Sequence, residues 1–209
     1  MPKLYLLGGE NVFKRSAREV NERAFQDAGE PLFILVFSWA RALFDNSYKK
    51  RKALADYFRK LGASAITFVD YSDSNGMIAR KMDDSNLIYL TGGQTSILIE
   101  RLKKMSVDSL IQDYSGIIVG RSAGALALCR KCVITCRSNS KSKIISGLGL
   151  ADLTLKVHYK LEKDPVLEQL SKNEKIYAVP IGSALVYRDG ACLSIGDVYL
   201  FENGEKHRL

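Results

Sequence analysis

Short apolar runs alternate along the chain with longer segments that have helical periodicity. The apolar runs have the length of strands and lie at residues 4–7, 32–37, 65–69, 87–90 and 116–119. The helical segments lie at residues 18–28, 46–61, 77–82, 97–104, 107–114 and 122–129. This alternation is typical of β-α-β units, whose parallel strands are buried on both faces. The pattern predicts an α/β fold with a mainly parallel sheet.

The pattern changes toward the C-terminus, where a predicted helix precedes the last 35 or so residues. A helix is expected at 165–170, where Pro165 can occupy the first turn, and short strands are expected at 176–179, 183–187, 191–195 and 197–201. The segments Arg188-Asp189-Gly190 and Asn203-Gly204 are typical hairpin turns. We therefore expect an antiparallel C-terminal hairpin at the edge of the sheet. A polar stretch at 137–143 predicts a loop. The sequence has no segment with the composition of a linker, so we expect one domain, 1–209.

Composition and charge narrow the class of protein. The 209 residues are 46% apolar and 26% charged, which is typical of a globular chain. The apolar run 31–40 is too short to span a bilayer, and no signal segment is visible, so we expect a cytoplasmic protein that does not bind membranes. The net charge is +8, but its densest cluster, at 49–52, has no interleaved aromatic residues. We expect a solvated helix face there, not a nucleic-acid site, and a field that favours anionic substrates.

Three of the four cysteines fall close together, with the spacing C-x2-C-x3-C at Cys129, Cys132 and Cys136. A structural zinc site needs four ligands, and neither histidine lies near this run. We expect ordinary thiols, mostly buried, and no metal or other cofactor.

The sequence Gly120-Arg121-Ser122-Ala123-Gly124 has the form G-x-S-x-G and lies between a predicted strand and a predicted helix. In that context the serine sits on a tight, strained turn, and the helix N-terminus provides N–H groups for a developing oxyanion. Ser122 is therefore the candidate nucleophile, with the Ala123 N–H as an oxyanion donor. The alternative is a structural turn or one that holds phosphate.

A nucleophilic serine needs a base, and the chain has two histidines. His207 lies in a polar tail, so elimination favours His158. No Asp or Glu lies between Ser122 and Ala151 to orient the base. The open possibilities are a Ser–His dyad, a backbone carbonyl, or the side chain of Asp152, Glu162, Asp197 or Asn139.

A second glycine turn, Thr91-Gly92-Gly93-Gln94, follows the predicted strand at 87–90. Its backbone is free to face a ligand, so Gly93 could donate a second N–H, and Gly92 and Gln94 are candidate substrate contacts. A plain strand-to-helix turn is the alternative. Arg121 could bind a substrate carboxylate through two hydrogen bonds, or form a surface ion pair.

The combination of Tyr89 to Thr95, Gly120 to Ala125 and Gly147-Leu148-Gly149-Leu150 with His158 shortly after resembles the dipeptidase E and cyanophycinase family of serine peptidases. The resemblance covers nearly the whole chain. It implies a fold related to class I glutamine amidotransferases, a three-layer αβα sandwich, and hydrolysis of small peptides next to aspartate. It also implies that Ser122 is the nucleophile, His158 the base, and Gly93 and Ala123 the oxyanion donors.

This chain departs from the family pattern at two places. The family carries an acid in the region that here reads Cys132 to Asn139, and it has a small or aromatic residue where this chain has Arg121. The principal hypothesis is a serine peptidase whose partner is a small acidic peptide, acting as a monomer or a homodimer. The alternatives are a binding or regulatory homologue with impaired catalysis, and a serine esterase or amidase on the same scaffold.

Overall fold

The larger of two sheets forms the centre of the molecule. The computed structural model describes residues 2–11, 14–41, 48–135 and 142–209. The sheet has seven strands in the order β11-β10-β1-β5-β4-β2-β3. Its parallel strands are β1 (Lys3–Leu7), β2 (Phe33–Phe37), β3 (Ala65–Val69), β4 (Leu87–Leu90) and β5 (Ile117–Arg121). The hairpin of β10 (Ala184–Arg188) and β11 (Ala191–Ile195) pairs antiparallel with β1 at one edge.

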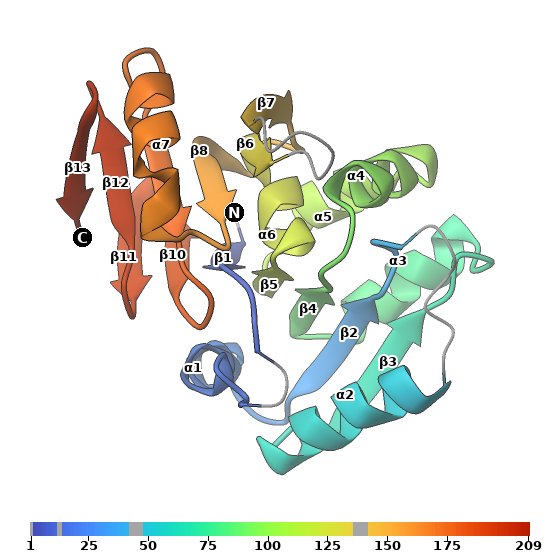
Figure 1. The fold of residues 1–209 in the computed structure, drawn as a ribbon. Helices are drawn as coiled ribbons and strands as arrows, with labels where there is room; N and C mark the ends of the chain where they lie inside the picture. The colour runs from blue at the N-terminus through green and yellow to red at the C-terminus, as the bar shows by residue number, and fades with distance from the viewer. Residues whose placement is uncertain (1, 12–13, 42–47, 136–141) are drawn as a thin grey trace.

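Helices cover both faces of this sheet (Figure 1). One face packs on α1 (Arg18–Ala28) and α2 (Tyr48–Lys60), and the other packs on α3 (Asn75–Asp83), α4 (Thr95–Lys104), α5 (Val107–Asp113) and α6 (Ala123–Leu128). Alternate side chains enter the two cores: Tyr5 and Leu7 face α1, whereas Leu4 and Leu6 join the opposite cluster. The predicted α/β class and three-layer arrangement are confirmed.

A second, six-stranded sheet lies beside the first, in the order β13-β12-β9-β8-β6-β7. Its strands are β6 (Cys129–Thr135), β7 (Ser142–Ser146), β8 (Ala151–Val157), β9 (Ile176–Val179), β12 (Tyr199–Glu202) and β13 (Glu205–Arg208). A short 3-10 turn, η1 (Leu161–Lys163), leads into α7 (Asp164–Ser171), whose Leu167 packs with Ile176 and Phe201 on one face of this sheet. The other face shares its core with α6.

The sequence prediction differs from the structure mainly in this second sheet. The predicted C-terminal hairpin exists as β10 and β11, but β9 and β12 belong to the smaller sheet. Strands β7 and β13 were not predicted, and residues 142–143, expected in a loop, begin β7. The rest of that predicted loop, 136–141, lies outside the described residues. In the described ranges, no helix is long and apolar enough to cross a membrane.

We predict opposite stability effects for alanine at two helical glycines. A Cβ on Gly124, in α6, would lie 2.3 Å from the Leu90 carbonyl oxygen, whereas a Cβ on Gly76, in α3, would meet nothing within 4 Å. Gly124→Ala should therefore lower the free energy of unfolding by about 1–3 kcal/mol through overpacking. Gly76→Ala, the matched control, should raise it by up to about 1 kcal/mol through helix propensity. Urea denaturation measures both, and equal effects would contradict the close approach of α6 to β4.

Candidate active site

The segment that follows β1 holds the candidate nucleophile and base together. Three successive carbonyl oxygens accept backbone hydrogen bonds of 2.9 Å: Leu7 from Ser122 N–H, Gly8 from His158 N–H, and Gly9 from Gly182 N–H. Neither glycine has room for a side chain, because a Cβ would lie 2.1 Å from the Pro180 oxygen at Gly8 and 2.5 Å from His158 Cε1 at Gly9. The sequence analysis did not single out this Gly-Gly pair.

Ser122 occupies a strained turn between β5 and α6. Its φ of 54° and ψ of −106° are rare for a residue with a side chain. The turn is tight because the residues around Ser122 are small: a Cβ on Gly120 would lie 2.6 Å from the Ala125 nitrogen. The strand therefore ends directly against the start of the helix, and the turn presents the Ser122 hydroxyl at the carboxyl end of the sheet.

His158 follows the last residue of β8 and brings its ring to Ser122. The distance from Ser122 Oγ to His158 Nε2 is 2.6 Å, which is a hydrogen bond. The ring packs on Gly9, with Cε1 and Nδ1 nearest to that backbone. A serine hydroxyl can donate to Nε2 only when that nitrogen carries no proton, so a role as base requires the neutral tautomer with its proton on Nδ1. The structure thus brings together the two residues that the sequence analysis paired.

Of the four candidate side chains for orienting His158, the three described carboxylates each lie beside a cation and not beside the imidazole. Asp152, at the far end of β8, is 76% exposed and bonds to Arg130 at 2.5 Å. Asp197 pairs with Arg208 at 2.6 Å, and Glu162 lies 3.7 Å from Lys163. Asn139 lies outside the described residues. Within the described ranges, no carboxylate or backbone carbonyl accepts a hydrogen bond from His158 Nδ1, so packing on Gly9 orients the ring.

The surroundings of His158 favour its neutral form. Partial burial lowers the pKa of the imidazole below its usual value of 6.5, and the positive charges of Lys156 and Arg121 lower it further. Lys156 is itself buried in β8, donates to Thr135 Oγ1 at 3.0 Å, and has its pKa lowered to about 8, mainly by burial. The sequence analysis did not single out Lys156. At neutral pH the imidazole is therefore ready to accept a proton.

Two backbone N–H groups near Ser122 are candidates to donate hydrogen bonds to an oxyanion. Ala123 is the first residue of α6, so its N–H has no acceptor within the helix. In the β4–α4 turn, Thr91 N–H donates to Phe37 O at 3.1 Å and Gln94 N–H donates to Ala40 O at 2.6 Å. Gly93 lies between them, and its N–H donates to no backbone oxygen among the described residues.

This β4–α4 turn lies directly beside Ser122. A Cβ on Gly92 would sit 3.4 Å from Ser122 Cβ, and a Cβ on Gly93 would collide with the Ala40 oxygen at 2.3 Å. Gly92 is half-buried, whereas Gly93 and Gln94 are exposed. The turn therefore places accessible backbone beside Ser122.

Arg121, next to Ser122, forms an ion pair, which was one of the two alternatives from the sequence, but its partner is a buried acid that the sequence did not identify. Its Nη1 lies 3.0 Å from Oε2 of Glu10, whose side chain is only 1% exposed. The other Glu10 oxygen, Oε1, is buried and has no hydrogen-bond partner among the described residues. Glu10 follows Gly8-Gly9 at the carboxyl end of β1, which neighbours β5 in the sheet. Because active residues gather at the carboxyl ends of parallel strands, that position was the available signal.

Two of the described cysteines lie in the hydrophobic core. Cys129 and Cys132 are buried free thiols, and burial raises the pKa of Cys132 to about 12, so both are unreactive. Cys136 lies outside the described residues. In the described part of the chain, no three His, Cys, Asp or Glu side chains gather closely enough to hold a metal ion.

Comparison with known proteins finds related peptidases. A model of peptidase family S51 matches residues 42–195. An uncharacterized peptidase of Listeria innocua is 25% identical over 143 residues, covering 62% of this chain and 68% of that protein. An uncharacterized peptidase of Listeria monocytogenes is 29% identical over 96 residues, or 42% of this chain, and the match spans about half of that relative, 47% of its length.

The fold has relatives among solved structures. The crystal structure of a peptidase from an acI-B1 Actinobacterium superposes with a TM-score of 0.75 at 19% identity, covering 100% of this chain and 94% of that one. The family match covers most of the chain, including Ser122, His158 and the β4–α4 turn, although Gly8, Gly9 and Glu10 precede it. The chain belongs to peptidase family S51, the dipeptidase E family.

Proposed function

We propose that this protein is a serine peptidase that hydrolyses small peptides next to aspartate, through an acyl-enzyme on Ser122. The observation that carries the proposal is the 2.6 Å contact between Ser122 Oγ and His158 Nε2, on a strained turn at a helix N-terminus. A nucleophile in reach of a neutral base, with backbone donors beside it, is the arrangement that acyl transfer requires.

The reaction proceeds in two halves. His158 Nε2 takes the proton of Ser122 as Oγ attacks the peptide carbonyl. The Gly93 and Ala123 N–H groups donate hydrogen bonds to the oxyanion that forms. The imidazolium then gives that proton to the leaving amine, and the C–N bond breaks. In the second half, water attacks the ester carbonyl and gives a proton to His158. His158 then gives that proton to Ser122 Oγ as the bond between Oγ and the acyl carbon breaks.

Arg121 supports an acidic substrate. Arg121 directly precedes the nucleophile, its side chain is 19% exposed, and Glu10 holds its guanidinium. A fixed guanidinium can bind a carboxylate strongly. We assign the aspartate side chain next to the scissile bond to this group, with Gly92 and Gln94 completing the contact.

The lack of a described carboxylate beside His158 favours a second candidate function. No carboxylate in the described residues contacts His158, and an imidazolium that forms beside Lys156 and Arg121 is not stabilised by a negative charge. A homologue that binds acidic peptides without turnover would have this arrangement. Hydrolysis of Asp-Ala by the wild-type protein, followed by amino-acid analysis, separates the peptidase from the binding protein.

A fluorophosphonate probe should label Ser122 in the folded protein. The hydroxyl is activated by His158, so His158→Gln should slow labelling by about 100-fold or more, and Ser122→Ala should abolish it. Mass spectrometry of the labelled peptide identifies the site. A wild-type protein that folds normally but takes no label would remove the basis of the proposed mechanism.

The rate of labelling should fall at acid pH with an inflection below the usual histidine value. The cations near His158 lower its pKa, so Lys156→Met, which removes one of them, should raise that pKa and move the inflection to higher pH. Lys104→Met is the matched control, because Lys104 is exposed on α4 and should leave the profile in place. An inflection that stays fixed, or moves down, in Lys156→Met would contradict this electrostatic assignment.

A further inference from the structure

A cavity of about 400 Å³ opens beside the candidate active site, on the side of α2. It is bounded by the start of α2, the segment after β2, the end of β3 and the β4–α4 turn, and it reaches the nucleophile through Gly92 and Arg121. Its lining includes apolar surface from Phe68, Leu54 and Ala53. A volume of this size is typical of sites for small molecules and short peptides, and too confined for a nucleic acid duplex.

Five cationic side chains line this cavity, and among the described residues that line it none is acidic. The cations are Arg15, Arg41, Lys50, Arg51 and Arg121. They come from four separate segments of the chain, so the cluster is a product of the fold and not of one basic run. Charge of one sign in a concave, partly apolar site raises the local concentration of oppositely charged ligands.

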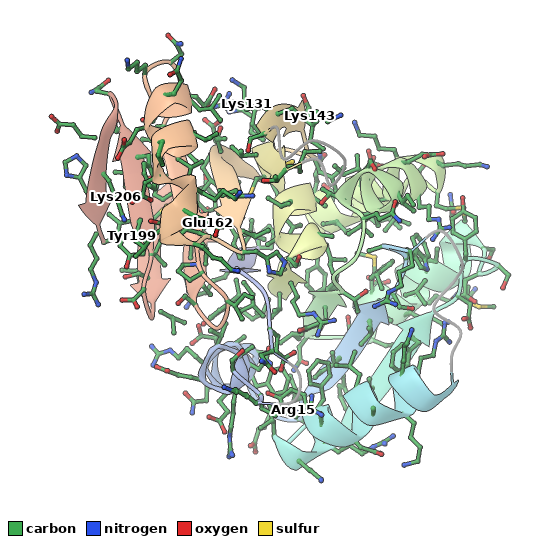
Figure 2. All side chains as sticks on the ribbon, viewed as in Figure 1. Arg15, Lys131, Lys143, Glu162, Tyr199 and Lys206 are labelled. Atoms are coloured by element: carbon green, nitrogen blue, oxygen red, sulfur yellow. The ribbon has the colours of Figure 1, made fainter. Side chains whose placement is uncertain are left out.

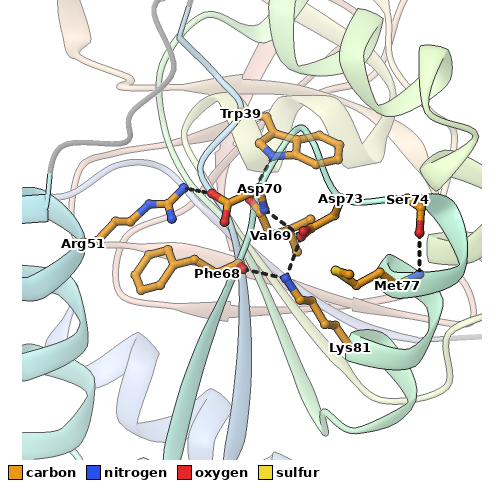
Figure 3. Close-up of polar contacts among 9 residues, drawn as sticks. All are labelled: Trp39, Arg51, Phe68, Val69, Asp70, Asp73, Ser74, Met77 and Lys81. Carbon is orange, nitrogen blue, oxygen red and sulfur yellow. Dashed lines mark hydrogen bonds and ion pairs between the residues drawn. The ribbon is translucent and has the colours of Figure 1, made fainter.

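Arg51 is held in place by a network at the end of β3 (Figure 3). Its Nη2 lies 2.7 Å from Asp70 Oδ1, and its guanidinium stacks over the Phe68 ring at 5.1 Å. The Asp70 N–H donates to Asp73 Oδ2 at 2.9 Å, and Lys81 contacts the same oxygen at 2.6 Å. A guanidinium fixed in this way loses little freedom when it binds a second carboxylate.

The opposite wall of the cavity is also organised. Arg15 lies between α1 and α2 (Figure 2), with its guanidinium 4.1 Å from the centre of the Tyr57 ring. Arg121 is held by Glu10. An Asp-Xaa dipeptide with one acidic side chain carries two carboxylates, that side chain and its C-terminal group. Because each carboxylate needs one guanidinium, the five cations that line the cavity exceed what such a dipeptide requires.

We propose that this cavity is a second anionic subsite, and that the preferred substrates are peptides with two acidic side chains, one next to the scissile bond and one within the cavity. The inference rests on the proposed peptidase function. The first carboxylate binds at Arg121, and the second binds among Arg51, Lys50 and Arg15. In this cavity the second side chain is recognised by its charge and not by its shape, so Asp and Glu are both accepted there.

Matched peptide pairs that differ only in one charge test the proposal. The probes are Asp-Glu against Asp-Gln, and Glu-Asp-Ala against Gln-Asp-Ala, so that the second acid is offered on either side of the aspartate. In at least one pair the acidic member should have a kcat/KM about tenfold higher or more, mainly through a lower KM. Added salt should reduce this ratio, because screening weakens attraction between charges.

Variants in the cavity wall locate the effect. Arg51→Gln and Lys50→Gln should each lower the preference for the acidic member of the pair several-fold toward equality, and Lys104→Gln, on the exposed surface of α4, should leave it as in the wild type. Two variants are used because Arg51 also joins the Asp70 network, whereas Lys50 is exposed on α2. Equal kcat/KM for both members of every pair in an active wild type would overturn the second subsite.

Binding separates this proposal from the proposed function. Isothermal titration of Ser122→Ala with the same peptide pairs measures the subsite without hydrolysis. Tighter binding of the acidic members by about tenfold, lost in the double variant with Arg51→Gln, supports the subsite even if the wild type hydrolyses nothing. Equal binding of both members overturns it, even if the wild type hydrolyses Asp-Ala.

Discussion

Three backbone hydrogen bonds to consecutive carbonyls at the end of β1 are the constraint on which the site depends. Leu7 O, Gly8 O and Gly9 O bind the backbones of Ser122, His158 and Gly182, which belong to different parts of the chain. Ser122 follows a strand of the larger sheet, and His158 follows a strand of the smaller one. The relative position of the two sheets therefore sets the distance between hydroxyl and imidazole, and the glycines allow the backbones to approach.

This constraint also explains how His158, which is exposed, can be oriented without a contacting acid among the described residues. Its ring lies against Gly9, with Nδ1 and Cε1 in the place that a Gly9 side chain would take. Packing supplies orientation and leaves out the negative charge that an acid would add. Burial and the nearby cations Lys156 and Arg121 then act together to keep the ring neutral.

The sequence was sufficient for the parallel sheet, its helices and the Ser122 turn, because buried strands and amphipathic helices have distinct periodicities. It was insufficient for β13, whose residues Glu205 to Arg208 are all polar, and for the second sheet, since local patterns do not reveal which strands pair. Strand β6 begins directly after α6 with no turn residue to separate them. Lys156 was missed because its importance comes from contacts made across the fold. Glu10 was missed although its position at the carboxyl end of β1 was a signal, because its partner Arg121 lies far away in the sequence.

The cations beside the site act on the two stages of catalysis in opposite directions. Before the reaction they keep His158 neutral, but they also raise the free energy of the imidazolium that forms when it takes the serine proton. A substrate that brings carboxylates to Arg121 and to the cavity beyond it adds negative charge next to these cations and offsets their effect on the imidazolium. A neutral substrate leaves that repulsion in place. Because no acid among the described residues contacts the histidine, the charge of the substrate itself bears on how readily the proton moves. The selectivity for acidic peptides and the acyl transfer that we propose therefore have the same electrostatic origin.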